Sequence, residues 1–593
     1  MTGHARFDVV LRTPWAGPWR RFSRPLRVIE TRDAREVRRT LRAVDEAVRG
    51  GNYAAGFVTY EAAAAFGLPS GAGDDRLPLV CFGIYPPDHV ESLARLPLAG
   101  DASFGRWEPS MDHDGYLTAI AAIKARIEAG DTYQINFTFR LRAPFSGDPM
   151  AAMRQLYAAQ AGPWSAFVEM DAFAICSASP ELFYTADGER VVSRPMKGTW
   201  PRGFWAAQDT ARGEELRTSA KNRAENVMIA DMVRNDLGRV ARVGSVRPTS
   251  LFDVERYPLQ WQMVSTVEAD VNTPSLGRVM GAMFPCGSIT GAPKHSSMQI
   301  IRALETAPRG IYTGAIGYLT PGGRSHFSVA IRTVVIDRAR GAAEFGVGSG
   351  VVWDSVDQDE YEECLLKARM LEGPAASTPS TSGAAYVVAD PPGFHLLETI
   401  LWAPEAGFAL LDSHLERLRA SAECFGFEFD RDEVRIVLDA AVGDLRGAAK
   451  VRVRVGADGT VLCEAFDLAP LPPTLRLGRA AEPIDRRDVF LYHKTTNRSV
   501  YERARASRPE ADAVLLWNTE GEITEATDAN IVVVRDGVKR TPPVECGLLP
   551  GTMRAALLDS GEIREGRMSV EDLQQADQIW LVNSVRGWMR GEL

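Results

Sequence analysis

The sequence has few cysteines and none of the spacings that pair them or bind a metal. Seven cysteines lie singly along 593 residues without a C-x-x-C, and the eight histidines show no zinc-ligand spacing. This pattern is typical of free thiols in a reducing compartment. No apolar run is long enough to span a bilayer, and no apolar signal region opens the chain. We therefore expect a cytoplasmic protein without membrane contact. The net charge of -9 argues against nucleic acid as a partner.

One stretch marks a division of a chain that is too long for a single core. Residues 374–384 are small, polar and proline-bearing, which predicts a flexible linker. The linker separates a first domain, residues 1–373, from a second domain, residues 385–593. Strand-like runs and amphipathic helices mix in the first domain, which predicts an α+β layered fold.

Local patterns place several elements of the first domain. Asp114 is expected to cap a helix that ends before Gly130, and residues 132–139 alternate as a strand should. Ser219 precedes a second helix, and residues 359–371 form a third.

One lysine stands where a covalent reaction would need it, in Pro195-Met196-Lys197-Gly198-Thr199. A β-branched run enters this stretch, a proline stiffens it, and a glycine frees the backbone after the lysine. A lysine held in poor solvent can lose its proton and act as a nucleophile. By themselves these five residues are more often a surface turn, so neighbouring motifs must decide.

Three further features of the first domain can carry chemistry. Glu360, Glu363 and Lys367 share one helical face, either as a solvated stripe or, joined by Glu225, as a magnesium site. Residues 346–352 are rich in glycine but lack a P-loop lysine, so they form either a plain turn or an anion-binding backbone. Residues 287–294 are expected to open a helix, whose N-terminus favours a carboxylate.

Six motifs occur in order and together resemble the chorismate-binding enzymes. They are Gly130–Asn136, Ser179–Phe183, Pro195–Thr199, Arg223–Asn226, Arg234–Asp236 and Gly287–Lys294. Within that family, anthranilate synthases usually carry alanine where Lys197 stands, and isochorismate and salicylate synthases a lysine where Gln134 stands. The combination of lysine at 197 and glutamine at 134 resembles the pattern of aminodeoxychorismate synthase component I.

The resemblance implies a role for each matching residue. Lys197 would attack C2 of chorismate as the C4 hydroxyl departs, ammonia would then add at C4, and Glu181 would be the acid/base. Mg²⁺ would be held by Glu225 and Glu363, with Glu360 close behind. The substrate carboxylates would be held by Thr290, Gly291, Tyr312, Arg332, Gly348, Gly350 and Lys367. No glutamine amidotransferase signature occurs, so ammonia is expected from solution or from a separate glutaminase subunit.

The motifs of the second domain also fall into a familiar order. They are Leu396–Leu401, Leu411–Leu418, Tyr492–Arg498, Asn518–Asn530, Gly547–Arg554 and Asn583–Gly587. Singly, each is more often a cap or a surface charge, although the turn at Gly551-Thr552 opens a helix that can seat a phosphate. In order they resemble the fold-type IV enzymes that use pyridoxal 5′-phosphate (PLP). This group contains the branched-chain and D-amino-acid aminotransferases and aminodeoxychorismate lyase.

That second resemblance implies a PLP site and a homodimer formed through this domain. Lys494 would bond to the cofactor, and Glu525 would pair with its ring nitrogen. Thr399 would assist a lyase reaction, and the phosphate would be bound by Arg417, Thr527 and Thr552.

The pairing of the two resemblances predicts a bifunctional enzyme. The first domain would make 4-amino-4-deoxychorismate, and the second would release pyruvate and 4-aminobenzoate for folate. Two alternatives stay open: an anthranilate-type synthase joined to a generic class IV aminotransferase, and a non-catalytic regulatory or binding subunit. The presence of Lys197, Glu181, Glu225, Glu363, Lys494 and Glu525 argues against the last.

Overall fold

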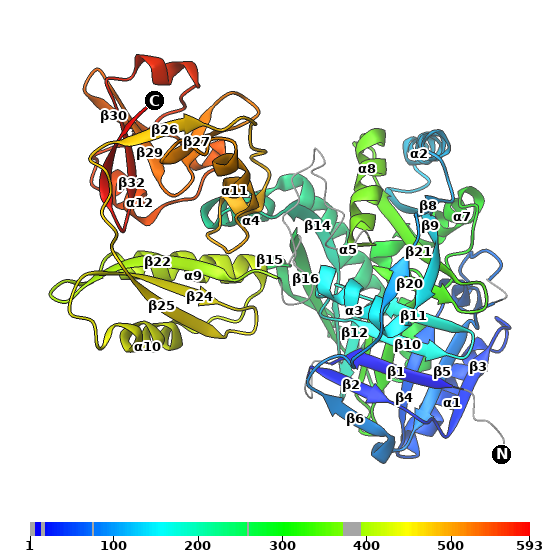
Figure 1. The fold of residues 1–593 in the computed structure, drawn as a ribbon. Helices are drawn as coiled ribbons and strands as arrows, with labels where there is room; N and C mark the ends of the chain where they lie inside the picture. Colours follow the sequence, from blue (N-terminus) through cyan, green and yellow to red (C-terminus); the bar gives the residue numbers. More distant parts are fainter. Residues whose placement is uncertain (1–5, 14–17, 74–75, 258–259, 372–392) are drawn as a thin grey trace. The chain divides into compact units, whose positions relative to one another are not determined.

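The computed structural model describes residues 6–13, 18–73, 76–257, 260–371 and 393–593. The expected linker, residues 374–384, lies outside the described residues. The chain forms two compact units, of which the first combines Met1–Trp200 with Gly213–Ala376. The second combines Pro201–Arg212 with Ser377–Leu593 (Figure 1). No helix in the described ranges is long and apolar enough to cross a membrane.

The first unit contains an eleven-stranded antiparallel sheet. Its strand order is β17 (Gly291–Ala292), β9 (Gln134–Gly147), β21 (Ala342–Val351), β20 (Thr333–Asp337), β11 (Phe173–Ser177), β10 (Ala166–Met170), β1 (Phe7–Arg12), β2 (Trp19–Phe22) and β6 (Val90–Leu93), while β7 (Ala102–Phe104) and β8 (Glu108–Pro109) pair with β9.

A second sheet of ten strands completes the β-structure described in this unit. Its order is β14 (Met196–Pro201), β16 (Gln260–Asp270), β13 (Arg190–Arg194), β12 (Leu182–Asp187), β19 (Ser325–Val329), β18 (Ala315–Leu319), β4 (Tyr53–Val58), β5 (Val80–Tyr85) and β3 (Arg27–Thr31), while β15 (Arg247–Arg256) pairs with β16.

Helices cover the outer faces of these two sheets. They are α1 (Val37–Arg49), α2 (His113–Glu128), α3 (Pro149–Gln160), α5 (Ala220–Gly238), α6 (Leu276–Met283), α7 (Lys294–Leu304) and α8 (Asp357–Ala368), with short 3₁₀ turns η1 (Tyr60–Phe66), η2 (Pro87–His89), η3 (Gly287–Ile289) and η4 (Arg369–Leu371).

The pattern of β4 explains why both faces of the ten-stranded sheet are covered. Ala55 and Phe57 enter an apolar core shared with strands of the eleven-stranded sheet, whereas Ala54 and Val58 enter a core shared with α1, α5 and α6. Successive side chains of a strand point to opposite faces, so a continuous apolar run must be buried on both. The expected α+β layered fold is confirmed.

The helices and the strand predicted in the first domain are present with small shifts of their ends, and one predicted helix cap was wrong. The strand predicted over residues 132–139 is the start of β9, and Ser219 accepts a hydrogen bond from the amide of Asn222 at the start of α5. The cap of α2 is Asp112, whose carboxylate accepts from the amide of Gly115, and not Asp114. Asp114 lies inside the first turn, where its charge is equally compatible with the helix dipole.

The second unit has two sheets. The smaller has the order β23 (Gly407–Phe408), β22 (Leu396–Ala403), β24 (Ala449–Val455) and β25 (Val461–Asp467). The larger has the order β28 (Ile523–Ala526), β27 (Ala513–Trp517), β26 (Leu475–Arg479), β33 (Gly587–Glu592), β32 (Gln578–Asn583), β29 (Asn530–Arg535), β30 (Val538–Thr541) and β31 (Arg564–Glu565).

Four helices described in this unit pack on these sheets, and a fifth begins here. They are α9 (Leu411–Phe425), α10 (Arg431–Val442), α11 (Ser499–Ala506) and α12 (Thr552–Asp559), with η5 (Val489–Leu491), η6 (Val544–Cys546) and η7 (Glu571–Gln575), while α4 (Ala206–Thr218) starts in the second unit and ends in the first. The valines of β24 alternate with charged residues, and their buried face forms one core with α9 and α10.

Candidate functional sites

Lys197 lies on β14, an edge strand of the ten-stranded sheet, and faces α5. Its Nζ is 3.3 Å from Glu225 Oε2, and the two side chains are 19% and 16% exposed. Asn226, next on the helix, donates through Nδ2 to the Lys197 carbonyl at 3.1 Å. Adjacent residues of α5 therefore hold both the backbone and the amine of this lysine.

The eleven-stranded sheet reaches the same amine through Gly350 and Gln134. A Cβ built on Gly350 would lie 2.3 Å from Lys197 Nζ and 3.2 Å from Gln134 Nε2. Only glycine leaves room for the amine at this point of β21. The Gln134 side chain is fully buried, and neither its oxygen nor its nitrogen has a hydrogen-bond partner among the described residues. A buried amide without a partner is costly, which indicates a place for a polar ligand beside Lys197.

Glu181, directly before β12, has a buried carboxylate. Ser288 donates to its Oε1 at 2.6 Å. Burial raises the pKa of Glu181 to about 7, against the lowering influence of the Ser288 hydrogen bond and the Lys197 charge. A carboxyl that titrates near neutral pH can both donate and accept a proton during turnover.

Two cations, Lys367 of α8 and Arg332 just before β20, lie close to Glu363 of α8. Lys367 Nζ lies 2.5 Å from Glu363 and donates to the Gly348 carbonyl at 2.8 Å, while Arg332 donates to the Lys367 carbonyl at 2.9 Å. Desolvation alone would raise the pKa of Glu363, but the charges of Lys367, Lys197 and Arg332 hold it below its usual value. Four of the predicted substrate and metal residues thus meet here.

The predicted carboxylates do not gather into one cluster. Glu360 accepts from Ser355 Oγ at 2.6 Å, whereas Glu225 and Glu363 each pair with a lysine. No group of three metal-ligating side chains occurs among the residues described. Mg²⁺ commonly takes only one or two protein carboxylates and fills its shell with water and substrate oxygens. Glu225 and Glu363 both lie near the positive charge of Lys197. A site made of these two carboxylates fits the coordination of Mg²⁺ better than a site that also includes Glu360.

The side chains of Thr290 and Tyr312 both contact other residues of the protein. The Thr290 hydroxyl donates to the carbonyls of Cys286 and Gly287, both at 3.1 Å. The Arg140 guanidinium lies 5.1 Å from the centre of the Tyr312 ring, and burial raises the pKa of that phenol to about 12. Gly291 pairs with Ile135 of β9, which carries Gln134 at its start. Gly291 therefore lies beside the strand that carries Gln134, and the Tyr312 ring lies against Gly346 of β21.

In the second unit, Lys494 follows η5 in a loop pinned to β22. Its carbonyl accepts from the amide of Leu397 at 2.9 Å. Burial lowers the pKa of Lys494 to about 8, and the neighbouring charge of Arg417 acts in the same direction. A lysine with a pKa near 8 has an appreciable neutral, nucleophilic fraction at physiological pH.

Glu525 of β28 is a buried carboxylate held by three donors. They are the Tyr501 hydroxyl at 2.8 Å, the Leu549 amide at 3.0 Å and Asn530 Nδ2 at 3.3 Å. Burial raises the pKa of Glu525 to about 7, and the positive charges of Arg498 and Lys494 oppose that rise. Such a site favours a cationic ligand, which would restore the ionised carboxylate.

Glu398 of β22 joins two of the predicted phosphate ligands. Arg417 donates to both of its oxygens at 2.7 Å, and His414 Nδ1 lies 2.7 Å from Oε2. Thr552, the first residue of α12, contacts His414 Nε2 at 3.2 Å. Burial would raise the pKa of Glu398, but Arg417 and His414 hold it far below its usual value. Arg417 and Thr552 are thereby brought into one network.

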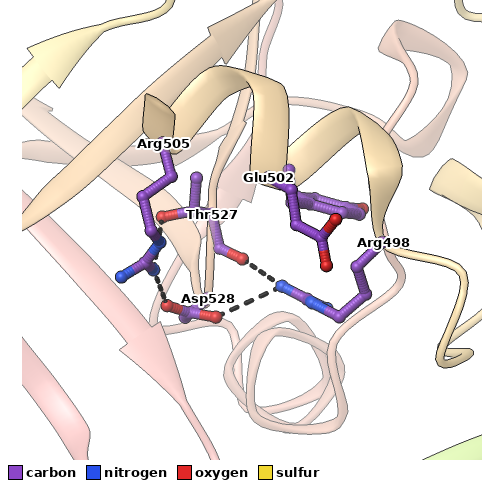
Figure 2. Close-up of a pocket in the computed structure, with 6 residues that line it drawn as sticks. Arg498, Glu502, Arg505, Thr527 and Asp528 are labelled. Carbon is purple, nitrogen blue, oxygen red and sulfur yellow. Dashed lines mark hydrogen bonds and ion pairs between the residues drawn. The ribbon is translucent and has the colours of Figure 1, made fainter. Parts of the chain in front are cut away.

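Thr527 lies in a different environment. Its carbonyl accepts from Arg498 at 2.5 Å, its hydroxyl accepts from Arg505 at 3.2 Å, and Arg505 also pairs with Asp528. These residues line an open pocket of about 240 Å³ (Figure 2). Thr399 is half-buried on β22, and because strand side chains alternate, it points to the face opposite Glu398.

Comparison with known proteins assigns each half of the chain to a family. Residues 16–373 match the family described as chorismate binding enzyme, and residues 395–592 match the family described as amino-transferase class IV. The chain belongs to the chorismate binding enzyme family. Its second domain is of the class IV aminotransferase type, which implies PLP as a cofactor.

Individual relatives of this chorismate binding enzyme cover only part of it. It is 43% identical over 277 residues to aminodeoxychorismate synthase of Streptomyces griseus, covering 46% of this chain and 38% of that protein. It is 39% identical over 269 residues to anthranilate synthase component 1 of Thermus thermophilus, covering 45% and 57%. The chain thus spans about half the length of these curated relatives.

A solved structure has the fold of the first unit. Anthranilate synthase component I of Streptococcus pneumoniae is 24% identical and aligns with a TM-score of 0.52, covering 63% of this chain and 93% of that one.

The residues of the second unit fit PLP by the chemistry of their donors. Lys494, with its lowered pKa, suits the aldehyde of PLP, and the buried carboxylate of Glu525 suits the ring nitrogen. Arg417 and the N-terminus of α12 suit the phosphate. Sequence reasoning missed Glu398 and His414. A lone glutamate in the apolar run Leu396–Leu401 was the available signal, because a buried carboxylate needs paired cations.

Proposed function

We propose that this chain makes 4-aminobenzoate in two steps. The first unit aminates chorismate at C4, and the second eliminates pyruvate from the product. The observation that carries the first assignment is the approach of Gly350 and Gln134 to Lys197 Nζ. The amine of Lys197 thus lies near a buried amide that has no partner among the described residues, which supports the assignment, and the Streptomyces griseus relative is named aminodeoxychorismate synthase.

In the synthase step, Lys197 is the nucleophile. Glu225, 3.3 Å away, pairs with the Lys197 ammonium, which gives its proton to solvent before it attacks. The neutral amine adds to C2 of chorismate, the ring double bonds shift toward C4, and the C4 hydroxyl leaves with a proton from Glu181. Ammonia then adds at C4, the double bonds return, and the bond from C2 to Lys197 breaks. Glu181 accepts the proton that ammonia releases, which its pKa of about 7 permits.

Charged groups around Lys197 divide the remaining tasks. Arg332, Lys367 and the backbone at Gly348 and Gly350 bind the carboxylates of the substrate. Glu225 and Glu363 would hold Mg²⁺, which supplies Lewis-acid assistance to the departing hydroxyl.

In the lyase step, Lys494 holds the cofactor and then moves a proton. Arg417 and Thr552 would bind the phosphate of PLP, and Glu525 would pair with its ring nitrogen. PLP supplies an electron sink when it is bound. Lys494 would be the base that removes the proton at C4 of the intermediate. The enolpyruvyl group leaves from C3 and becomes pyruvate, and the ring becomes aromatic.

Partners and location complete the proposal. The sequence carries no glutamine amidotransferase signature, and the Thermus thermophilus relative is named as component 1. We therefore place the glutaminase on a separate subunit, with free ammonia as a substitute, and expect the second unit to form a homodimer. All seven cysteines are free, which suits a cytoplasmic enzyme.

The second candidate is an anthranilate-type synthase, because two relatives carry that name. Purified chain supplied with chorismate, ammonium, magnesium and PLP distinguishes them through the aromatic product. We expect 4-aminobenzoate and pyruvate in equal amounts. Anthranilate as the main product would overturn the assignment of the first unit, and an unchanged chorismate pool would point to a non-catalytic subunit.

A further inference from the structure

Residues 201–212 begin at the last residue of β14 and lie within the family match of the first domain, yet they belong to the second unit. Phe204 is only 8% exposed and is part of the core that contains Leu396, Leu491 and Tyr492. A segment that buries an aromatic ring in this core contributes to its stability. We call residues 201–212 the docking segment.

The docking segment contacts the residues immediately before Lys494. The rings of Phe204 and Trp205 stack on Tyr492, with centroids 5.6 and 5.1 Å away and planes inclined by 16° and 23°. The Phe204 carbonyl lies 2.9 Å from His493 Nε2. The two residues preceding the cofactor lysine are therefore both held by this segment.

The hydrogen bonds of His493 define one tautomer. A carbonyl can only accept, so Nε2 carries the proton that is donated to Phe204. Nδ1 is then the acceptor, and Ser421 Oγ, 2.9 Å away, donates to it. Burial lowers the pKa of His493 to about 4, so the ring is neutral at physiological pH. His493 thus bridges α9 and the docking segment without a competing protonation state.

The docking segment is itself internally braced. Arg202 and Asp209 form a buried two-point ion pair at 2.7 and 2.8 Å, and the Asp209 carboxylate also accepts from the amide of Gly203 at 2.8 Å. Gln208 accepts from the amide of Phe204 at 2.8 Å. These bonds fix the backbone at Phe204, so its carbonyl is presented in a set direction.

We propose that the docking segment is a positioning element for Lys494. The Leu397 amide holds the Lys494 carbonyl from one side, and the Phe204–His493 bond with the Tyr492 stack holds the preceding residues from the other. A catalytic lysine must be aligned closely with the atoms that it attacks and deprotonates. The proposal rests on the assignment of Lys494 as the cofactor lysine. It means that part of the family's synthase region is needed for the second reaction.

The test uses the full chain with three substitutions and one control. His493→Leu removes the donor to Phe204, His493→Gln retains a donor and an acceptor, and Trp205→Leu removes one stacked ring. Trp588→Leu removes an indole that packs edge-to-face on Trp580 elsewhere in the second unit. Hydrogen–deuterium exchange of residues 489–498 is measured in the cofactor-free protein, and kcat and KM are measured for pyruvate release from supplied 4-amino-4-deoxychorismate.

We expect His493→Leu and Trp205→Leu to speed exchange at residues 489–498 at least about tenfold, because a buried carbonyl loses its donor or the loop loses its stack. We expect kcat to fall more than KM changes, His493→Gln to recover most of both losses, and synthase activity to be unchanged. Exchange that stays at the parent rate, or rises equally in Trp588→Leu, overturns the proposal. If the parent chain binds no PLP, the cofactor assignment fails, while the exchange result still decides whether the docking segment positions the loop.

Discussion

Gly350→Ala should lower synthase activity about 10²-fold while leaving the fold intact. The new Cβ would lie 2.3 Å from Lys197 Nζ, and ordinary contact begins near 3.4 Å, so the amine must retreat by about 1 Å. The nearest atom belongs to the free end of a flexible side chain, so the backbone need not move and stability should change little. A displacement of about 1 Å at a nucleophile typically costs on the order of 10²-fold in rate.

The assay compares chorismate consumption, thermal unfolding and pyruvate release from supplied intermediate. Gly322→Ala is the matched control, because its nearest neighbour atom is 3.9 Å from the new Cβ. We expect a loss of about 10²-fold in chorismate consumption for Gly350→Ala alone, with unfolding temperature and lyase activity near the parent values. Full synthase activity in Gly350→Ala would refute the placement of Lys197 as the nucleophile.

Three further substitutions test the residues around Lys197. Lys197→Ala should lose amination at C4, and because C2 is then open, some 2-aminated product should appear; product analysis showing C4 amination at the parent rate would remove the nucleophile role. Glu363→Gln should raise the magnesium concentration needed for half-maximal synthase activity steeply, and activity that survives EDTA would return Glu363 to a simple ion pair. Glu181→Gln should abolish synthase activity and stabilise the protein above pH 7, by up to a few kcal/mol. The pKa of Glu181 in the folded parent, about 7, exceeds the ordinary glutamate value of 4.5, so the folded state binds more protons and the parent loses stability as pH rises between these values. Unfolding measured at pH 5 and pH 8 that shows the same difference between variant and parent would contradict this reasoning.

Local pattern was sufficient to predict elements whose signals lie within a few residues. The alternation over residues 132–139 predicted the start of β9, and Ser219 predicted the start of α5. The exchange of Asp114 for Asp112 as the cap of α2 shows the limit of this reasoning. Two acidic residues two positions apart both suit a helix start, and only the backbone geometry decides which side chain reaches an amide.

Contacts between residues that are far apart in the sequence could not be predicted from local patterns. The apolar run around Glu398 signals that its carboxylate needs cations, but it does not indicate that Arg417 and His414 of α9 supply them or that Thr552 of α12 contacts His414. The docking segment is a stronger case, since its neighbours in sequence belong to the first unit and its contacts to the second. The order of the motifs predicted Lys197, Glu181, Lys494 and Glu525 as site residues. The structure adds the neighbouring groups that hydrogen-bond to them or change their pKa values.

The claim that one chain carries two consecutive reactions is tested most directly with Lys494→Ala. Chorismate, ammonium, magnesium and PLP are supplied, and the pools of chorismate, 4-amino-4-deoxychorismate, pyruvate and 4-aminobenzoate are followed over time. We predict that chorismate is consumed at the parent rate and that the aminated intermediate accumulates without pyruvate. Addition of the Lys197→Ala chain, which retains Lys494, should then convert the intermediate to 4-aminobenzoate. Release of 4-aminobenzoate by the Lys494→Ala chain alone would contradict the account.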